Sequence, residues 1–191
     1  MKKIILTVFA ATSLLLYSTP SFALLSVSVG VPVASTLTAP ADDDGGKSKS
    51  DGSSGYFIGV QLPFAVGLGI DSYETKIKGT NQKVKTSMYN LFYQLPVPIV
   101  NLIIGLGTGE KKVDCPQFGE ELTGACSEYH KKGGATQWYT SIGVPLLPLF
   151  DIHLSYRSVT SKTVEYIGPN ADGSKSDLGE TVTGVGIAFN F

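Results

Sequence analysis

Four polar side chains that could take part in acid–base chemistry occur at alternate positions near the end of the chain. They are Asp151, His153, Ser155 and Arg157. Alternate residues of a β-strand point to the same face, so the four would lie together. Inside a narrow barrel, Arg157 and Asp151 would neutralise each other, with Asp71 as a further member of the network, because buried charges must be paired. Alternatively, His153 could activate Ser155 as a nucleophile if a carboxylate oriented its ring.

Two other stretches resemble ligand sites but lack the residues that such sites need. Asp42, Asp43 and Asp44 do not have the spacing of a calcium-binding loop. The glycine-rich stretch 105–111 lacks the Gly-Lys-Ser/Thr ending of a phosphate-binding loop. The sequence therefore predicts no cofactor and no metal site.

The chain begins with the pattern of a secretory signal peptide. Two lysines precede an apolar run from Ile4 to Tyr17, and small residues follow at Ser21 and Ala23. The run is shorter than the ~20 residues that a membrane-spanning helix needs. We therefore predict cleavage after Ala23, which leaves one domain over residues 24–191.

The chain has only two cysteines, Cys115 and Cys126, both in a polar segment. In an exported protein they are expected to form a disulfide that closes a small loop. A metal site would need further soft or imidazole ligands, and only His130 is close in sequence.

Apolar residues alternate with small or polar ones in eight stretches, as expected for strands whose two faces meet different environments. In the first stretch, Pro32 either ends the strand or marks a bulge. The predicted strands are 25–33, 56–62, 64–70, 89–95, 101–107, 137–144, 150–157 and 181–191.

The connections between these strands alternate in kind. Three are tight and uncharged, and they contain Pro63, Pro96 with Pro98, and Pro145 with Pro148. The others are polar and comprise a short loop at 79–81 and long loops at 36–54, 110–133 and 161–180. Short turns at one end and long loops at the other are typical of outer-membrane barrels. The sequence thus predicts an all-β fold, an eight-stranded antiparallel up-and-down transmembrane β-barrel.

The distribution of charge indicates which face of the strands meets lipid. No charged residue lies between Thr86 and Gly109 or between Gly133 and Phe150. A soluble barrel or sandwich would need a charged outer face, of which roughly a quarter to a third of the residues are charged. The face opposite the apolar one is instead rich in Gly, Ser, Asn and Gln, which suits a crowded lumen. Helical membrane spans are disfavoured because the apolar stretches are short and contain proline and repeated glycine.

The last six residues, Gly186-Ile187-Ala188-Phe189-Asn190-Phe191, resemble the C-terminal signature of bacterial outer-membrane barrels. In that signature, Gly186, Phe189 and Phe191 are the matching positions, whereas Gly184 replaces a larger polar residue. The plan of the chain is similar to that of the small OmpA- and OmpX-like proteins. This resemblance implies insertion by the outer-membrane assembly machinery and a non-enzymatic envelope role.

A second resemblance concerns the enzyme hypothesis. His153-Leu154-Ser155, with Pro169-Asn170 downstream, is similar to the lipid A deacylases of the outer membrane. That family has an Asn after the Ser, where this chain has Tyr156. A downstream Glu completes its triad, for which Glu165 and Glu180 are the candidates here. Its active residues face lipid, whereas the alternation turns His153 and Ser155 inward.

The sequence favours an outer-membrane protein that acts through its external loops and binds an extracellular ligand there. Its expected partners are outer-membrane lipid, lipopolysaccharide and the assembly machinery, and we expect a monomer. Nucleic acid is not expected, because 15 basic residues do not exceed 16 acidic ones. A narrow porin-like channel and a lipid A-modifying enzyme remain the alternatives.

Overall fold

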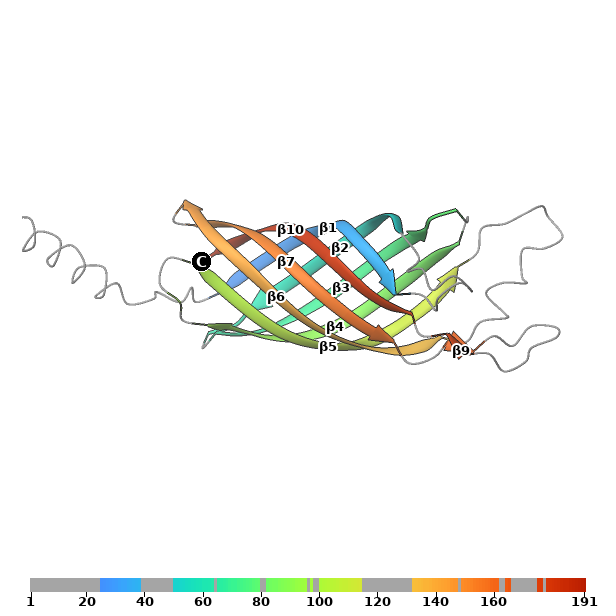
Figure 1. The fold of residues 1–191 in the computed structure, drawn as a ribbon. Coiled ribbons are helices and arrows are strands. Elements are labelled where there is room, and N and C mark those ends of the chain that lie inside the picture. The colour runs from blue at the N-terminus through green and yellow to red at the C-terminus, as the bar shows by residue number, and fades with distance from the viewer. Residues whose placement is uncertain are drawn as a thin grey trace, which may run out of the picture.

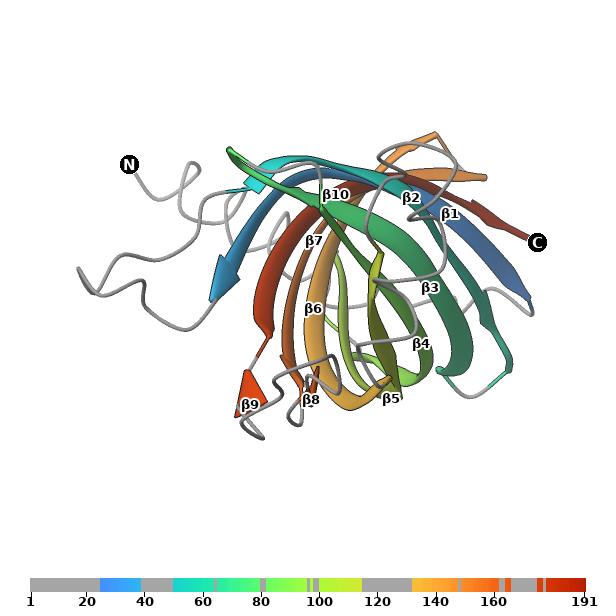
Figure 2. The same cartoon turned by 90° about the vertical axis from the view of Figure 1, so that its right-hand side faces the viewer.

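The computed structural model describes residues 25–38, 50–63, 65–79, 82–95, 97, 100–114, 132–147, 149–161, 164–165, 175–176 and 178–191. Within them, eight long antiparallel strands form a closed barrel in the order β1-β10-β7-β6-β5-β4-β3-β2. Figures 1 and 2 show its wall from the side and from the loop end. The predicted eight-stranded up-and-down β-barrel is confirmed.

The wall strands are 12 to 15 residues long, and a hairpin of two short strands, β8 and β9, lies between β7 and β10. The bounds are β1 Ser26–Thr38, β2 Ser50–Gln61, β3 Val66–Ile77, β4 Lys83–Leu95, β5 Asn101–Asp114, β6 Gly133–Leu147, β7 Phe150–Ser161, β8 Val164–Glu165, β9 Lys175–Ser176 and β10 Gly179–Asn190.

The barrel closes where the first strand meets the last. β1 and β10 pair from Ser26↔Asn190 to Thr38↔Gly179, so no strand is left with an unpaired edge. The backbone N–H of Phe191 donates to the carbonyl of Leu25 at 2.8 Å. The C terminus lies at the turn end of the barrel, opposite the end that carries β9 (Figure 1).

The strands extend further toward the loop end than predicted. β1 continues to Thr38, β2 begins at Ser50 and β5 continues to Asp114, so the predicted loops 36–54 and 110–133 are too long. Polar residues occupy both faces there, and the contrast that marks a strand in the sequence disappears. The backbone pairing continues nevertheless, for example at Glu74↔Lys85.

Prolines mark irregularities as well as turns. The register of β1 and β10 shifts between Pro32 and Ala34, so Pro32 belongs to a bulge and not to a strand end. The turn predicted through Pro145 and Pro148 starts later than predicted, because β6 runs on to Leu147 with a register shift after Pro145, and β7 begins at Phe150. The tight turn at Pro63 is present, and the N–H of Leu62 donates to the carbonyl of Val66 at 2.7 Å.

The two faces of the wall differ in composition as the alternation predicts. Large apolar side chains point outward and are between 36% and 70% exposed, among them Leu68, Leu106 and Leu154. The inward positions hold Asp, Asn, Gln, Ser and Arg side chains together with small apolar clusters. No helix among the described residues is long and apolar enough to cross a membrane.

Candidate functional site

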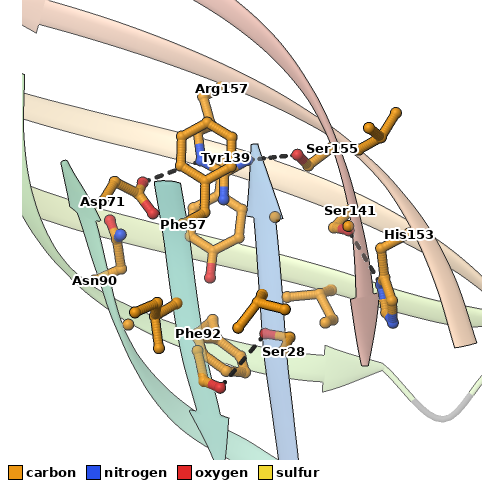
Figure 3. Close-up of a pocket in the computed structure, with 18 of the residues that line it drawn as sticks. Ser28, Phe57, Asp71, Asn90, Phe92, Tyr139, Ser141, His153, Ser155 and Arg157 are labelled. Carbon is orange, nitrogen blue, oxygen red and sulfur yellow. Dashed lines mark hydrogen bonds and ion pairs between the residues drawn. The ribbon is translucent and has the colours of Figure 1, made fainter. Parts of the chain in front are cut away.

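The centre of the lumen is occupied by Arg157, which projects from β7 toward the opposite wall (Figure 3). Its Nε donates to Asp71 Oδ2 at 3.0 Å, and its Nη1 donates to Ser155 Oγ at 2.5 Å. The guanidinium lies 3.6 Å from the centre of the Phe57 ring and 5.0 Å from that of Tyr139. A cation between two aromatic faces and beside a carboxylate is stabilised by both contacts.

The predicted pairing of Arg157 with Asp151 is wrong, because Arg157 pairs with Asp71. Arg157 and Asp151 are on the same strand, six residues apart, which corresponds to about 20 Å. Asp71 on β3 faces Arg157 across the lumen, and it also accepts a hydrogen bond from Gln137 Nε2 at 2.7 Å. Gln137 Nε2 in turn lies 2.9 Å from Asn90 Oδ1. Together these side chains form a central polar layer.

A second buried ion pair lies toward the loop end. Lys111 Nζ donates to Glu180 Oε2 at 2.8 Å, and both side chains are 0% exposed. The same ammonium donates to the carbonyl of Leu178 at 3.0 Å. The hydroxyls of Thr75 and Thr86 donate to the two oxygens of Glu180. Both desolvated charges are therefore hydrogen-bonded to each other and to neighbouring groups, as a buried pair requires.

The sequence analysis missed this loop-end layer because Lys111 and Glu180 fell in predicted loops. The signal that could have found them is the continued alternation on β5, where Gly107, Gly109 and Lys111 share the inward face. Beyond the pair, towards the loops, a buried cluster of Leu37, Val84, Val113 and Leu178 also fills the lumen.

A third polar layer lies near the turn end and contains Asp151. Asn101 Nδ2 donates to Asp151 Oδ2, and Asn190 Nδ2 donates to the same oxygen at 2.9 Å. Gln94 Nε2 donates to Asn101 Oδ1 at 2.6 Å. His153 Nε2 is 3.8 Å from Asp151 Oδ2, which is too long for a hydrogen bond. Asp151 thus belongs to a different layer from Ser155 and Arg157, and His153, which contacts Ser141, lies between them on β7.

The arrangement of His153 and Ser155 does not form a nucleophile–base pair. His153 Nδ1 contacts Ser141 Oγ at 3.3 Å, as Figure 3 shows, whereas Ser155 Oγ donates to the carbonyl of Gly184 at 3.2 Å. Both side chains are buried in the lumen and do not reach the outer face. A lipid substrate on the outer face would therefore not meet either residue.

The side chains leave little free space between the layers. One interior cavity of about 60 Å³ is lined by His153, Ser155, Arg157 and Phe57 among others, and another is about 10 Å³. A water molecule needs roughly 10–15 Å³ by this measure, so the cavities hold a few waters at most. Among the described residues, no group of His, Cys, Asp and Glu is placed to hold a metal ion.

The residues of the C-terminal signature lie where β10 meets β1 and β7. A Cβ at Gly186 would be 2.6 Å from the carbonyl oxygen of Val29, so only glycine fits this close approach. The rings of Phe189 and Phe150 are 4.8 Å apart, and Phe191 is largely exposed at the turn end. Such a position suits an aromatic residue at a membrane interface.

Several predicted features fall outside the described residues. These are the signal peptide 1–23, the aspartates at 42–44, Phe64, and both Cys115 and Cys126. The disulfide and the cleavage site stay predictions.

The comparisons with solved structures agree with the barrel. The chain superposes on Neisserial surface protein A with a TM-score of 0.65 and 13% sequence identity. The match covers 87% of this chain and 97% of that protein's chain. The chain has the fold of the small eight-stranded outer-membrane barrels. No family model matches the sequence, and no curated protein matches it either.

Two further outer-membrane barrels match over nearly their whole length. Outer membrane protein W of E. coli covers 89% of this chain and 98% of its own, with 11% identity and a TM-score of 0.48. OprG of Pseudomonas aeruginosa covers 89% and 96%, with 11% identity and a TM-score of 0.47. At these identities the likeness concerns the fold, and function must be argued from this chain's own residues.

Proposed function

We propose that the protein is an integral outer-membrane barrel that is closed to solutes and acts, without catalysis, by presenting its external loops at the cell surface. The observation that carries this proposal is the contrast between the two faces of the wall. Leucine and tyrosine side chains up to 70% exposed surround the outside, whereas salt bridges cross the inside. A face of this kind is stable in hydrocarbon and is a liability in water.

The filled lumen supports a structural role over a channel. Arg157 with Asp71 and Lys111 with Glu180 cross the lumen at two levels. An ion would have to displace both pairs, and the cavity between Arg157 and His153 is only about 60 Å³. An eight-stranded barrel is just wide enough for its side chains to fill, so this packing is the expected one.

The loops carry the proposed interaction with an extracellular ligand. The strand ends that these loops join lie at the end of the barrel opposite the C terminus, where β9 also lies (Figure 1). The sequence of a loop at this end can change without loss of the fold, because the barrel holds the strand ends in place. We further propose that Cys115 and Cys126 close the segment between β5 and β6 as a disulfide, and that the protein is a monomer inserted by the assembly machinery.

Two measurements test this function. A peptide epitope inserted between Cys115 and Cys126 should be accessible to antibody on intact cells, and accessibility only after the outer membrane is permeabilised would contradict the proposal. Purified protein in a planar lipid bilayer should give no steady ion conductance. Discrete conductance steps that disappear on heat denaturation would establish the channel alternative instead.

The enzyme alternative has its own test. Lipid A from cells that express the wild type should have the same acyl pattern in mass spectra as lipid A from cells without the protein. The variants His153→Ala and Ser155→Ala serve as matched controls. An acyl chain lost only with the wild type would contradict the non-enzymatic role.

A further inference from the structure

The outer surface of β2, β3, β4 and β5 carries two depressions, one above the other. The upper one, toward the loops, is about 340 Å³ and is lined by the hydroxyls of Ser54, Ser72 and Ser87 together with Lys85 and Glu74. The lower one is about 420 Å³ and is lined chiefly by Leu68, Tyr89, Leu91 and Leu106. Both depressions are open toward the surroundings of the barrel.

A single strand connects the two depressions. Along β4, Lys85, Ser87, Tyr89 and Leu91 alternate with buried residues and all point outward. Lys85 and Leu91 are about 20 Å apart along the strand, or about 15 Å in height at the usual strand tilt. The outward face therefore changes from ammonium to hydroxyl to hydrocarbon over the depth of a lipid headgroup and its upper acyl chains.

The upper region carries an excess of positive charge. Two pairs of lysines, Lys76↔Lys83 and Lys85↔Lys112, are directly opposite each other on neighbouring strands. Like charges in these positions repel and destabilise the sheet unless an anion lies between them. We call the outward charged residues of this region the basic face; they are Glu74, Lys76, Lys78, Lys83, Lys85, Glu110, Lys112, Asp114 and Lys132.

Acidic residues neutralise only part of this charge. Lys83 pairs with Glu74 at 2.7 Å, Lys85 with Asp114 at 2.6 Å, and Lys132 with Glu110 at 2.7 Å. Among the described residues, Lys76, Lys78 and Lys112 have no ion pair. The side chain of Lys85 is still 52% exposed and open to a ligand.

Among the residues that the structure describes, the opposite side of the barrel has no such outward charge. The outward residues of β7, β10 and β1 at the same height are hydroxyls, including Ser158, Thr160, Thr181, Thr183 and Thr36. The barrel is therefore asymmetric in the plane of the membrane, and an anionic headgroup would favour one side.

We propose that the basic face and the two depressions bind a phosphorylated glycolipid, the lipid A portion of lipopolysaccharide. Lys85 and Lys112 contact a phosphate, the serine hydroxyls contact the sugar, and acyl chains lie against Leu68, Leu91 and Leu106. Basic residues at the membrane surface attract anionic lipids in this way. The inference rests on the proposed membrane location, and its test separates the two.

The single tryptophan provides the probe. Trp138 is 50% exposed on the outer face of β6, and it is the Cα partner of Leu106 at the edge of the lower depression. In vesicles of phosphatidylcholine with brominated acyl chains, its fluorescence should be quenched by contact with bromine. Unbrominated lipid A that occupies the site should displace this lipid and restore the fluorescence, at a lower mole fraction than phosphatidylglycerol.

The variant Lys85→Ala/Lys112→Ala should need about tenfold more lipid A for the same recovery. Lys85→Arg/Lys112→Arg should behave like the wild type, because the charges remain. Lys76→Ala/Lys78→Ala is the matched control: it removes the same charge from exposed lysines farther from the apolar depression, and it should change little. Heat-modifiable gel migration checks that each variant is folded.

Each outcome of this experiment is decisive. Equal recovery with lipid A and phosphatidylglycerol would overturn the glycolipid site while leaving the membrane location intact. If the Lys85/Lys112 and Lys76/Lys78 variants need the same increase in lipid A, the attraction is a nonspecific effect of charge. This result would also overturn the proposed site. Trp138 fluorescence that brominated lipid does not quench at all would contradict the proposed function itself, and the site with it.

Discussion

The two faces of the barrel wall use the same strands but are stabilised in different ways. On the lumen face, Lys111 and Glu180 are fully buried and satisfied by each other and by nearby threonines. On the outer face, apolar side chains such as Leu154 are largely exposed. This exposure is favourable only if an apolar phase surrounds the barrel. A substitution in the lumen should therefore lower the unfolding free energy by leaving a buried group without its partner. A charged substitution on the outer face should lower it by exposing the charge to lipid.

The largest effect is expected from breaking the loop-end ion pair. Lys111→Met leaves the carboxylate of Glu180 buried and without its cation, which should cost about 3–5 kcal/mol of unfolding free energy. Urea unfolding of the barrel in lipid vesicles measures this loss. The double variant Lys111→Met/Glu180→Met should recover most of it, since no charge remains unpaired.

An exposed ion pair is the control for that variant. Lys132 and Glu110 are 2.7 Å apart, with side chains 59% and 51% exposed. Lys132→Met should cost about 0–1 kcal/mol in the same assay. Equal losses for Lys111→Met and Lys132→Met would mean that the lumen is wet and not packed.

A charge placed on the outer face should have the next largest effect. Leu154 lies at the middle of β7, and Leu154→Arg should cost about 2–4 kcal/mol if acyl chains surround it. Thr160→Arg, on the same face near the loop end, should be close to neutral. The same vesicle unfolding assay compares the two, and a tolerated Leu154→Arg would argue against a lipid environment.

Added volume should be resisted inside and tolerated outside. A Cβ at Gly105 would be 2.2 Å from the ring of Tyr139, whereas a Cβ at Gly134 would have nothing within 4 Å. Gly105→Ala should destabilise by about 1–3 kcal/mol through overpacking. Gly134→Ala should leave the unfolding free energy nearly unchanged, and a reversed order would contradict the filled lumen.

The smallest effect is expected from the partly exposed ion pair between β3 and β4. Lys83 Nζ lies 2.7 Å from Glu74 Oε1, and the two side chains are 36% and 26% exposed. Lys83→Ala should cost about 0–1 kcal/mol of unfolding free energy in the same vesicle assay, because an exposed pair contributes little. A loss as large as that of Lys111→Met would contradict the difference between the two faces.

The sequence was most informative where the two faces of a strand differ most. Alternation around Tyr89 and Leu91 and around Ile152 and Leu154 predicts the strands and which of their faces meets lipid. The prediction was weakest where both faces are polar, as at Lys111 and Glu180. In that region hydrophobic contrast is lost, although hydrogen bonding between strands continues.

The sequence predicts that polar and charged residues line the lumen, but it does not predict which of them pair. Residues such as Arg157 and Asp71 must be paired once they are buried, and the sequence indicates that much. Their partners depend on stagger and on distance across the lumen, which alternation along one strand does not encode. Asp151 could have been excluded as the partner of Arg157 from the sequence, because six residues along one strand span about 20 Å. Asp71 was named as a member of the network, but not as the residue that pairs with Arg157.

The most direct test of the account is gel migration of the protein from purified outer membranes, with and without boiling. A closed transmembrane barrel resists detergent, so the unheated protein should be in the outer-membrane fraction and should migrate differently from the boiled protein. Recovery in the soluble periplasmic fraction, with identical migration before and after boiling, would contradict the claim that the apolar face of this barrel meets lipid.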